Sequence, residues 1–74
     1  MAVYVRHDPR GCSEALGAAA AKLHRDTLAT VEYAVWNVWR VDGIPLVALA
    51  EWLDEEGFDA EVCTLHTAVV VHAV

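Results

Sequence analysis

Segments that favour strands alternate with segments that favour helices along this chain, and their order restricts the fold more than any single motif does. Residues 2–7 and 31–41 are rich in β-branched and aromatic residues, which favour strands. Between them, residues 14–29 have apolar side chains at helical spacing and many alanines, which predicts a helix. A second helix is predicted over residues 45–56, and residues 60–74 favour strands again.

The predicted order is therefore β-α-β(β)-α-β(β), and a chain of 74 residues has room for one small domain. Two helices packed on one face of a small antiparallel sheet satisfy this order most economically. We expect a single α+β domain over residues 1–74, with the architecture of a ferredoxin-like sandwich. Residues 31–41 form either one long bulged strand or a tight hairpin, because the alternation slips near Trp36. Residues 60–74 form either one long strand or two short ones.

Each predicted helix has a face that we expect to be buried. In the first helix this face consists of Leu16, Ala20, Leu23 and Thr27. In the second helix it consists of Leu46, Leu49, Ala50 and Leu53. Gly57 is suited to the C′ position after the second helix, where Phe58 is expected to pack on Leu53 as in a Schellman motif.

Composition and charge exclude some classes of function. Asp and Glu number 11 and Lys and Arg number 5, which argues against direct nucleic-acid binding, because phosphates require clustered cations. A hydrophobic content of 57% with 22% charged residues is typical of a folded domain and not of a disordered tail. No apolar run approaches the roughly 18 residues that span a bilayer, and no basic region precedes the short apolar start. We therefore expect a cytoplasmic protein that does not bind membranes.

Acidic residues gather in the second half of the chain. Residues 1–30 have a net charge of +1, and residues 31–74 have a net charge of −7. Six acids lie between positions 51 and 61 with no base among them: Glu51, Asp54, Glu55, Glu56, Asp59 and Glu61. Three of them fall in the last turn of the second helix, where the helix dipole disfavours negative charge.

These acids have three candidate roles. The first is a solvated helix end that maintains solubility, and the second is a surface that binds a basic protein. The third is a divalent-cation site at Glu51 with Asp54 or Glu55, although the sequence has no EF-hand spacing to support it. Trp52 lies beside the predicted buried face and next to the acids. It is either a half-buried core residue or an apolar anchor of the same binding surface.

Catalytic motifs are absent from the sequence. There is no glycine-rich phosphate loop, no nucleophile elbow and no metalloprotease helix motif. Carboxylates on an exposed helix end also lack the desolvation that a general acid needs. We therefore expect no enzymatic activity and no cofactor.

Metal ligation and a disulfide framework are also weakly supported. His7 and Cys12 offer at most two ligands, whereas structural metal sites need four. Cys63 and His66 are expected to point to opposite faces of a strand. Two cysteines are too few for a disulfide scaffold, so we expect reduced thiols, with a Cys12–Cys63 bridge as the alternative.

The whole chain is small, acidic and alanine-rich, and it has no catalytic motif or targeting signal. In these properties it resembles the phage-encoded anti-CRISPR proteins, which include type I-C inhibitors from Pseudomonas with a ferredoxin-like fold. The resemblance implies a protein partner, a subunit of the type I-C surveillance complex (Cascade) of the bacterial host, and a block of target-DNA binding. An acidic surface can occupy a DNA channel lined by Lys and Arg. We therefore expect a monomeric inhibitor that binds its partner through Glu51, Trp52, Asp54, Glu55, Glu56, Asp59 and Glu61.

Two other functions fit the sequence. A small metal- or thiol-dependent binding module would use the loop around Cys12, because a cysteine near a helix N-terminus can be activated. A homo-oligomeric interaction module would pair copies edge to edge through residues 69–71, which are three valines.

Overall fold

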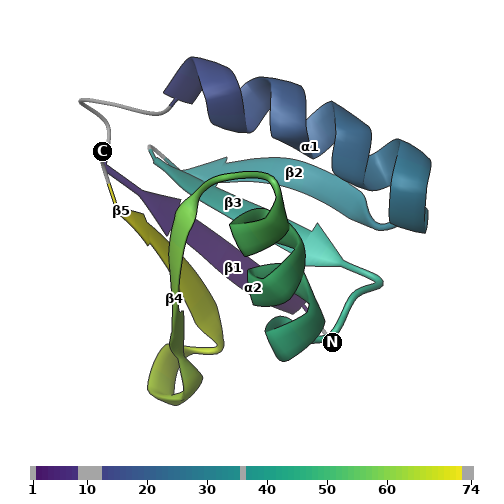
Figure 1. Ribbon diagram of the computed structural model, residues 1–74. Coiled ribbons are helices and arrows are strands. Elements are labelled where there is room, and N and C mark those ends of the chain that lie inside the picture. Colours follow the sequence, from purple (N-terminus) through teal and green to yellow (C-terminus); the bar gives the residue numbers. More distant parts are fainter. Residues whose placement is uncertain (1, 9–12, 36, 73–74) are drawn as a thin grey trace.

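Within the residues that the computed structural model describes, 2–8, 13–35 and 37–72, five strands form one sheet and both helices pack on the same face of it (Figure 1). In chain order the elements are β1 (Ala2–His7), α1 (Ser13–Thr27), β2 (Thr30–Val35), β3 (Val38–Asp42), α2 (Leu46–Glu55), β4 (Asp59–Cys63), the 3-10 turn η1 (Thr64–His66) and β5 (Ala68–His72). This order confirms the expected small α+β fold of ferredoxin-like type.

The strands lie in the order β2-β3-β1-β5-β4. β1 pairs antiparallel with β3 and parallel with β5, and the antiparallel hairpins β2–β3 and β4–β5 complete the sheet. The parallel pair arises because β4 takes the edge and β5 turns back between β4 and β1. Both segments that the sequence left open are therefore hairpins. Because β5 has a neighbour on each side, the prediction that copies pair through residues 69–71 is wrong.

The core lies between the sheet and the two helices. Alternate residues of β1, β3 and β5 face it, each at most 4% exposed: Val3, Val5, Val41, Val69 and Val71. The helices contribute Leu16, Ala19, Leu23, Leu49, Ala50 and Leu53. Of the predicted helix faces, Leu16, Leu23, Leu49, Ala50 and Leu53 are confirmed as buried, whereas Ala20 and Leu46 are only half-buried. Thr27 is exposed because it ends α1, where its hydroxyl donates to the Leu23 carbonyl at 2.7 Å.

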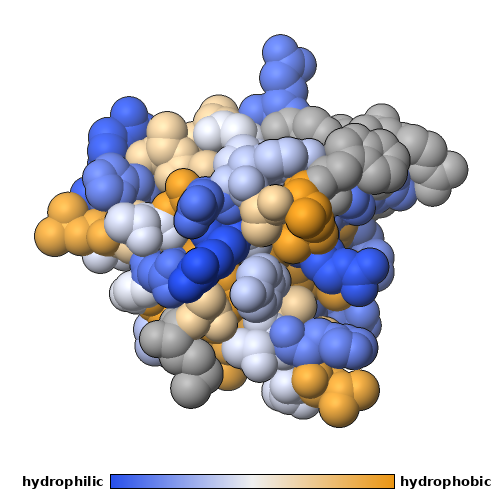
Figure 2. Space-filling view, turned by 180° about the vertical axis from the view of Figure 1, so that it is seen from behind, coloured by the Kyte–Doolittle hydropathy of each residue, from blue (hydrophilic) through white to orange (hydrophobic). Residues whose placement is uncertain are grey.

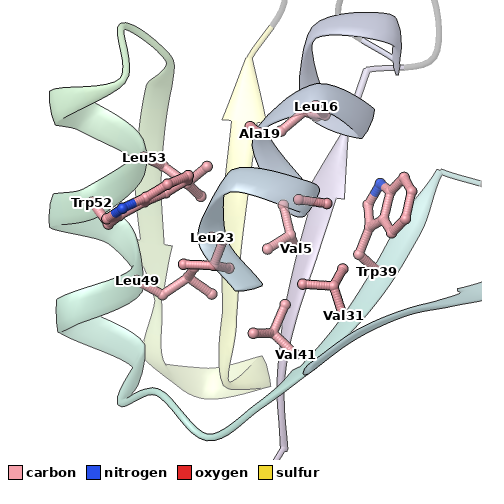
Figure 3. Close-up of a pocket in the computed structure, with 11 residues that line it drawn as sticks. Val5, Leu16, Ala19, Leu23, Val31, Trp39, Val41, Leu49, Trp52 and Leu53 are labelled. Atoms are coloured by element: carbon pink, nitrogen blue, oxygen red, sulfur yellow. The ribbon is translucent and has the colours of Figure 1, made fainter. Parts of the chain in front are cut away.

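An apolar cavity of about 20 Å³ remains between the helices and the sheet (Figure 3). Trp39 from β3 and Trp52 from α2 lie on opposite sides of it, and residues of both helices line it. A volume of this size holds about one water molecule, and an apolar lining offers that water no hydrogen bonds. The cavity is therefore a packing gap and not a ligand site.

The end of α2 has the predicted Schellman geometry. Gly57 adopts φ +95°, its N–H donates to the Asp54 carbonyl at 3.0 Å, and the Phe58 N–H donates to the Leu53 carbonyl at 3.1 Å. Phe58 packs against the core cluster that contains Leu53. This tight turn leads the chain directly from α2 into β4, so that the two elements lie side by side.

The β2–β3 turn is docked onto the end of β1. Asn37 has φ 56°, its side-chain amide donates to the His7 carbonyl at 2.8 Å, and its backbone N–H donates to the Tyr33 hydroxyl at 2.9 Å. Trp36, most of the turn predicted after β1 and the whole of the Cys12 loop from residue 9 to residue 12 lie outside the described residues.

Candidate functional site

The acids predicted to bind a partner lie on two neighbouring elements at one edge of the sheet. α2 packs against β4, and β4 is the last strand of the sheet (Figure 1). All six acids are exposed: Glu51, Asp54, Glu55, Glu56, Asp59 and Glu61. We call these six residues the acidic edge.

The acidic edge wraps around β4 and does not form one flat surface. Ala60 and Val62 of β4 pair with Val71 and Val69, whose side chains face the helices. Successive strand residues point to opposite faces, so Asp59 and Glu61 project to the face without helices. Figure 2 views the molecule from behind, and hydrophilic and hydrophobic side chains are intermixed on that side. The structure thus brings the six acids to one edge, with the helix acids on one side and the strand acids on the other.

Two of the six acids have cationic or ionisable partners. Lys22 of α1 donates to both carboxylate oxygens of Glu56, at 2.8 and 2.9 Å. This hydrogen bond raises the pKa of Lys22 above its ordinary value of 10.5. The His72 ring lies 3.4 Å from Glu61. Within the described part of the chain, the other four acids have no ion pair or side-chain hydrogen bond.

The helix acids also lie where the backbone disfavours them. α2 has no basic residue in its last turn and no acidic residue in its first turn, the reverse of the arrangement that a helix dipole favours. Glu51 lies three and four residues before Asp54 and Glu55, so these like charges repel one another on one helix surface. Since Lys22 compensates only Glu56, the placement of Asp54 and Glu55 costs stability without a visible structural benefit.

Trp52 is a core residue in its geometry. It is half-buried, packs against the central cluster, and directs its ring from α2 toward the interior (Figure 3). The role of a half-buried core residue, one of the two predicted for Trp52 from the sequence, therefore accounts for its burial. A contact between Trp52 and a partner stays a prediction.

Cys63 and His66 are in contact, which corrects the expectation that they point to opposite faces. The strand ends at Cys63, and residues 64–66 form a 3-10 turn that Thr67 closes at φ 49°. This turn places the His66 Nδ1 atom 3.3 Å from the Cys63 Sγ atom. The rule of strand alternation failed because the chain leaves the strand at that point.

His7 is a buried residue that the sequence analysis did not single out for burial. Its side chain is 6% exposed at the end of β1, and among the described residues neither ring nitrogen has a hydrogen-bond partner. The Trp39 indole N–H is likewise buried and unpaired there, with its ring centroid 6.5 Å from that of His7. The period-two alternation of Val3 and Val5 continues to His7 and would have predicted its burial.

Other classes of site find no support in the described parts of the chain. No three His, Cys, Asp or Glu side chains there are arranged as metal ligands. None of the helices in these ranges has the length and apolar character needed to cross a membrane. Comparison with protein families, with curated proteins and with solved structures gives no match.

Proposed function

We propose that this chain is a non-enzymatic inhibitor that binds a Lys/Arg-rich protein site through its acidic edge. The observation that carries the proposal is the placement of unpaired carboxylates on α2 and β4 in a chain of net charge −6. Three of them, Glu51, Asp54 and Glu55, are disfavoured by the helix dipole or repel one another. Solubility alone would be served by acids at positions that cost nothing. A surface reserved for a basic partner explains why the charge is gathered on one edge.

The candidate partner follows from the resemblance to anti-CRISPR proteins. The DNA channel of a type I-C surveillance complex presents Lys and Arg at the spacing of phosphates. The molecule extends 28 Å along its longest axis, which corresponds to about eight nucleotide steps of 3.4 Å. A body of that size, with carboxylates on one edge, would occupy part of the channel and keep target DNA out. The protein would act in the cytoplasm of the bacterial host.

A competition assay tests this function. A purified type I-C surveillance complex is offered fluorescent target DNA together with increasing amounts of this protein, at low and at moderate salt. We expect DNA binding to be lost at near-stoichiometric protein, and inhibition to weaken with salt because complementary charges drive association. Unchanged DNA binding, with no complex on a sizing column, would exclude this partner.

Charge reversal tests the assignment of the surface. The double variant Asp54→Lys/Glu55→Lys should lose inhibition, and it leaves the Lys22–Glu56 ion pair in place. The matched control is Glu14→Lys/Asp26→Lys, which changes the net charge equally but lies on α1, outside the acidic edge. Equal inhibition by both double variants would refute the acidic edge as the binding surface.

The thiol-dependent alternative has one structural observation in its favour, the contact between Cys63 and His66. A thiolate beside an imidazole can be a reactive group. The variants Cys63→Ser and Cys12→Ser separate the two functions, since an inhibitor that acts through carboxylates retains its activity in both. Loss of inhibition in either variant would favour the thiol-dependent module.

A further inference from the structure

The edge of the sheet opposite the acidic edge is open. β2 pairs with β3 on one side, and within the described residues no strand covers its other side. Every residue of β2 except Val31 is exposed. Exposed edge strands present unpaired backbone donors and acceptors, and proteins commonly protect them with charges or irregularities. Asp59 and Glu61 are such charges on β4, and on β2 these features are limited to Glu32 and one register shift between Tyr33 and Val35.

Apolar side chains are exposed along this same edge. Leu28, which precedes β2, is 79% exposed, and Tyr33 and Val35 are 51% and 61% exposed. Tyr33 lies on the face of the sheet that α1 covers, because it pairs with Trp39, whereas Val35 pairs with Val38 on the other face. Both sides of the open edge therefore offer apolar surface next to free backbone groups.

A hollow of about 360 Å³ runs beside the edge, between α1 and the sheet. Its described lining residues include no acid, lysine or arginine, and they are Ala20, Ala21, His24, Thr30, Val31 and Trp39. Ala20 and Ala21 present only methyl groups on this part of α1, so the larger side chains that an added strand would meet in the described lining are those of His24 and Trp39. Side chains of an added strand that point to the helix layer would enter the hollow.

The distribution of charge favours the approach of a second copy at this edge. Glu32 of β2 is the cross-strand partner of Arg40, so charges of both signs meet beside the open edge. The acidic edge lies at the other end of the sheet, four strands away. Two copies of a chain with net charge −6 repel each other least when their β2 strands approach and their acidic edges stay apart.

We infer that β2 is an interface for a second copy of this chain. Two β2 strands would pair antiparallel about a two-fold axis perpendicular to the sheet, which makes the contact self-complementary and keeps all four helices on one face. The result is a continuous sheet of ten strands. Nine inter-strand spacings of about 4.8 Å place the two acidic edges roughly 40 Å apart at its ends. The dimer replaces the monomer expected from the sequence. It goes beyond the proposed function, because it would present two acidic edges to one partner or to two.

Molar mass in solution tests the inference. Light scattering in reducing buffer, from low micromolar to near-millimolar protein, should show a mass that rises from 8.1 kDa toward twice that value. Hydrogen exchange at the β2 amides should slow over the same range of concentration. A mass of 8.1 kDa at every concentration would overturn the inference. So would β2 amides that become protected only with the surveillance complex, because they would assign the edge to a strand of that partner.

A pair of matched variants locates the interface. Val35→Glu places a second carboxylate beside Glu32 on the open edge and should raise the dimer dissociation constant by about tenfold or more. Val47→Glu makes the same change at a residue of α2 with a similar exposed fraction, 58% against 61%, and should leave the constant unchanged. Equal effects would exclude β2 as the interface. Asp54→Lys/Glu55→Lys should still dimerise, so a failure of the proposed function and a failure of this inference are distinguishable.

Discussion

Replacing Asp54 and Glu55 by lysine should stabilise the fold while it removes the function proposed for the acidic edge. Both residues are exposed in the last turn of α2, where there is no basic residue. Lysine at these positions would face the negative end of the helix dipole. It would also replace repulsion from Glu51, three and four residues earlier, by attraction.

The size of the gain follows from the geometry of the helix end. An exposed charge in the last turn contributes about 0.3–1 kcal/mol, and each reversal exchanges an unfavourable term for a favourable one. We take the lower part of this range, because Gly57 and Phe58 already donate to the carbonyls of Asp54 and Leu53. The double variant should then gain about 1 kcal/mol, which corresponds to a rise in Tm of roughly 4–8 °C for a domain of this size.

Thermal unfolding followed by circular dichroism measures this gain. The neutral variant Asp54→Asn/Glu55→Gln should show about half of it, and salt should reduce both gains because exposed charges are screened. An unchanged or lower Tm in the lysine variant, with its helix content intact, would refute the reasoning. The acids would then cost the fold nothing, and their placement would no longer indicate a partner.

Three further outcomes are expected. Gly17→Ala should stabilise the protein by about 0.5–1 kcal/mol, and Gly57→Ala should destabilise it by about 1 kcal/mol. Both positions have open space for a methyl group, but only Gly57 has a positive φ. Denaturant titrations that give the same sign for both variants would contradict this. His7→Leu should raise the free energy of unfolding by about 1 kcal/mol, because it removes two buried ring nitrogens that have no hydrogen-bond partner among the described residues. A fall in the urea midpoint of unfolding would mean that the imidazole is paired. Because the pKa of Lys22 is raised in the folded state, its ion pair with Glu56 stabilises the fold below pH 10.5 and is lost as pH rises through the raised value. The stability difference between wild type and Lys22→Met should therefore shrink above that pH, and a constant difference up to pH 12 would contradict the assignment.

Local sequence patterns were sufficient for the elements and for one helix end. The spacing of Leu16 and Leu23 predicted α1, and Gly57 with Phe58 predicted the end of α2 with its hydrogen bonds. Such patterns succeed because periodicity, propensity and capping depend on residues only a few positions apart. The acids of the acidic edge were recognisable for the same reason, since their clustering and their place in a helix turn are properties of one short segment.

Local patterns failed where the outcome depended on a turn or on distant residues. Cys63 and His66 were misplaced because the strand ends in a 3-10 turn, and Trp52 could not be assigned until the core around it was known. The place of β5 between β1 and β4 was also not predictable, because pairing joins residues more than sixty positions apart.

The sequence by itself therefore determined the α+β class, the two amphipathic helices and the acidic character of the segment from Glu51 to Glu61. The tertiary structure alone decided which strand occupies each edge of the sheet. The physical reason is that the order of strands in a sheet depends on contacts between residues distant in the sequence. Here those contacts are the packing of both helices on one face and the pairing of the final hairpin. That choice places the acids of α2 and β4 together at one edge and leaves β2 open at the other.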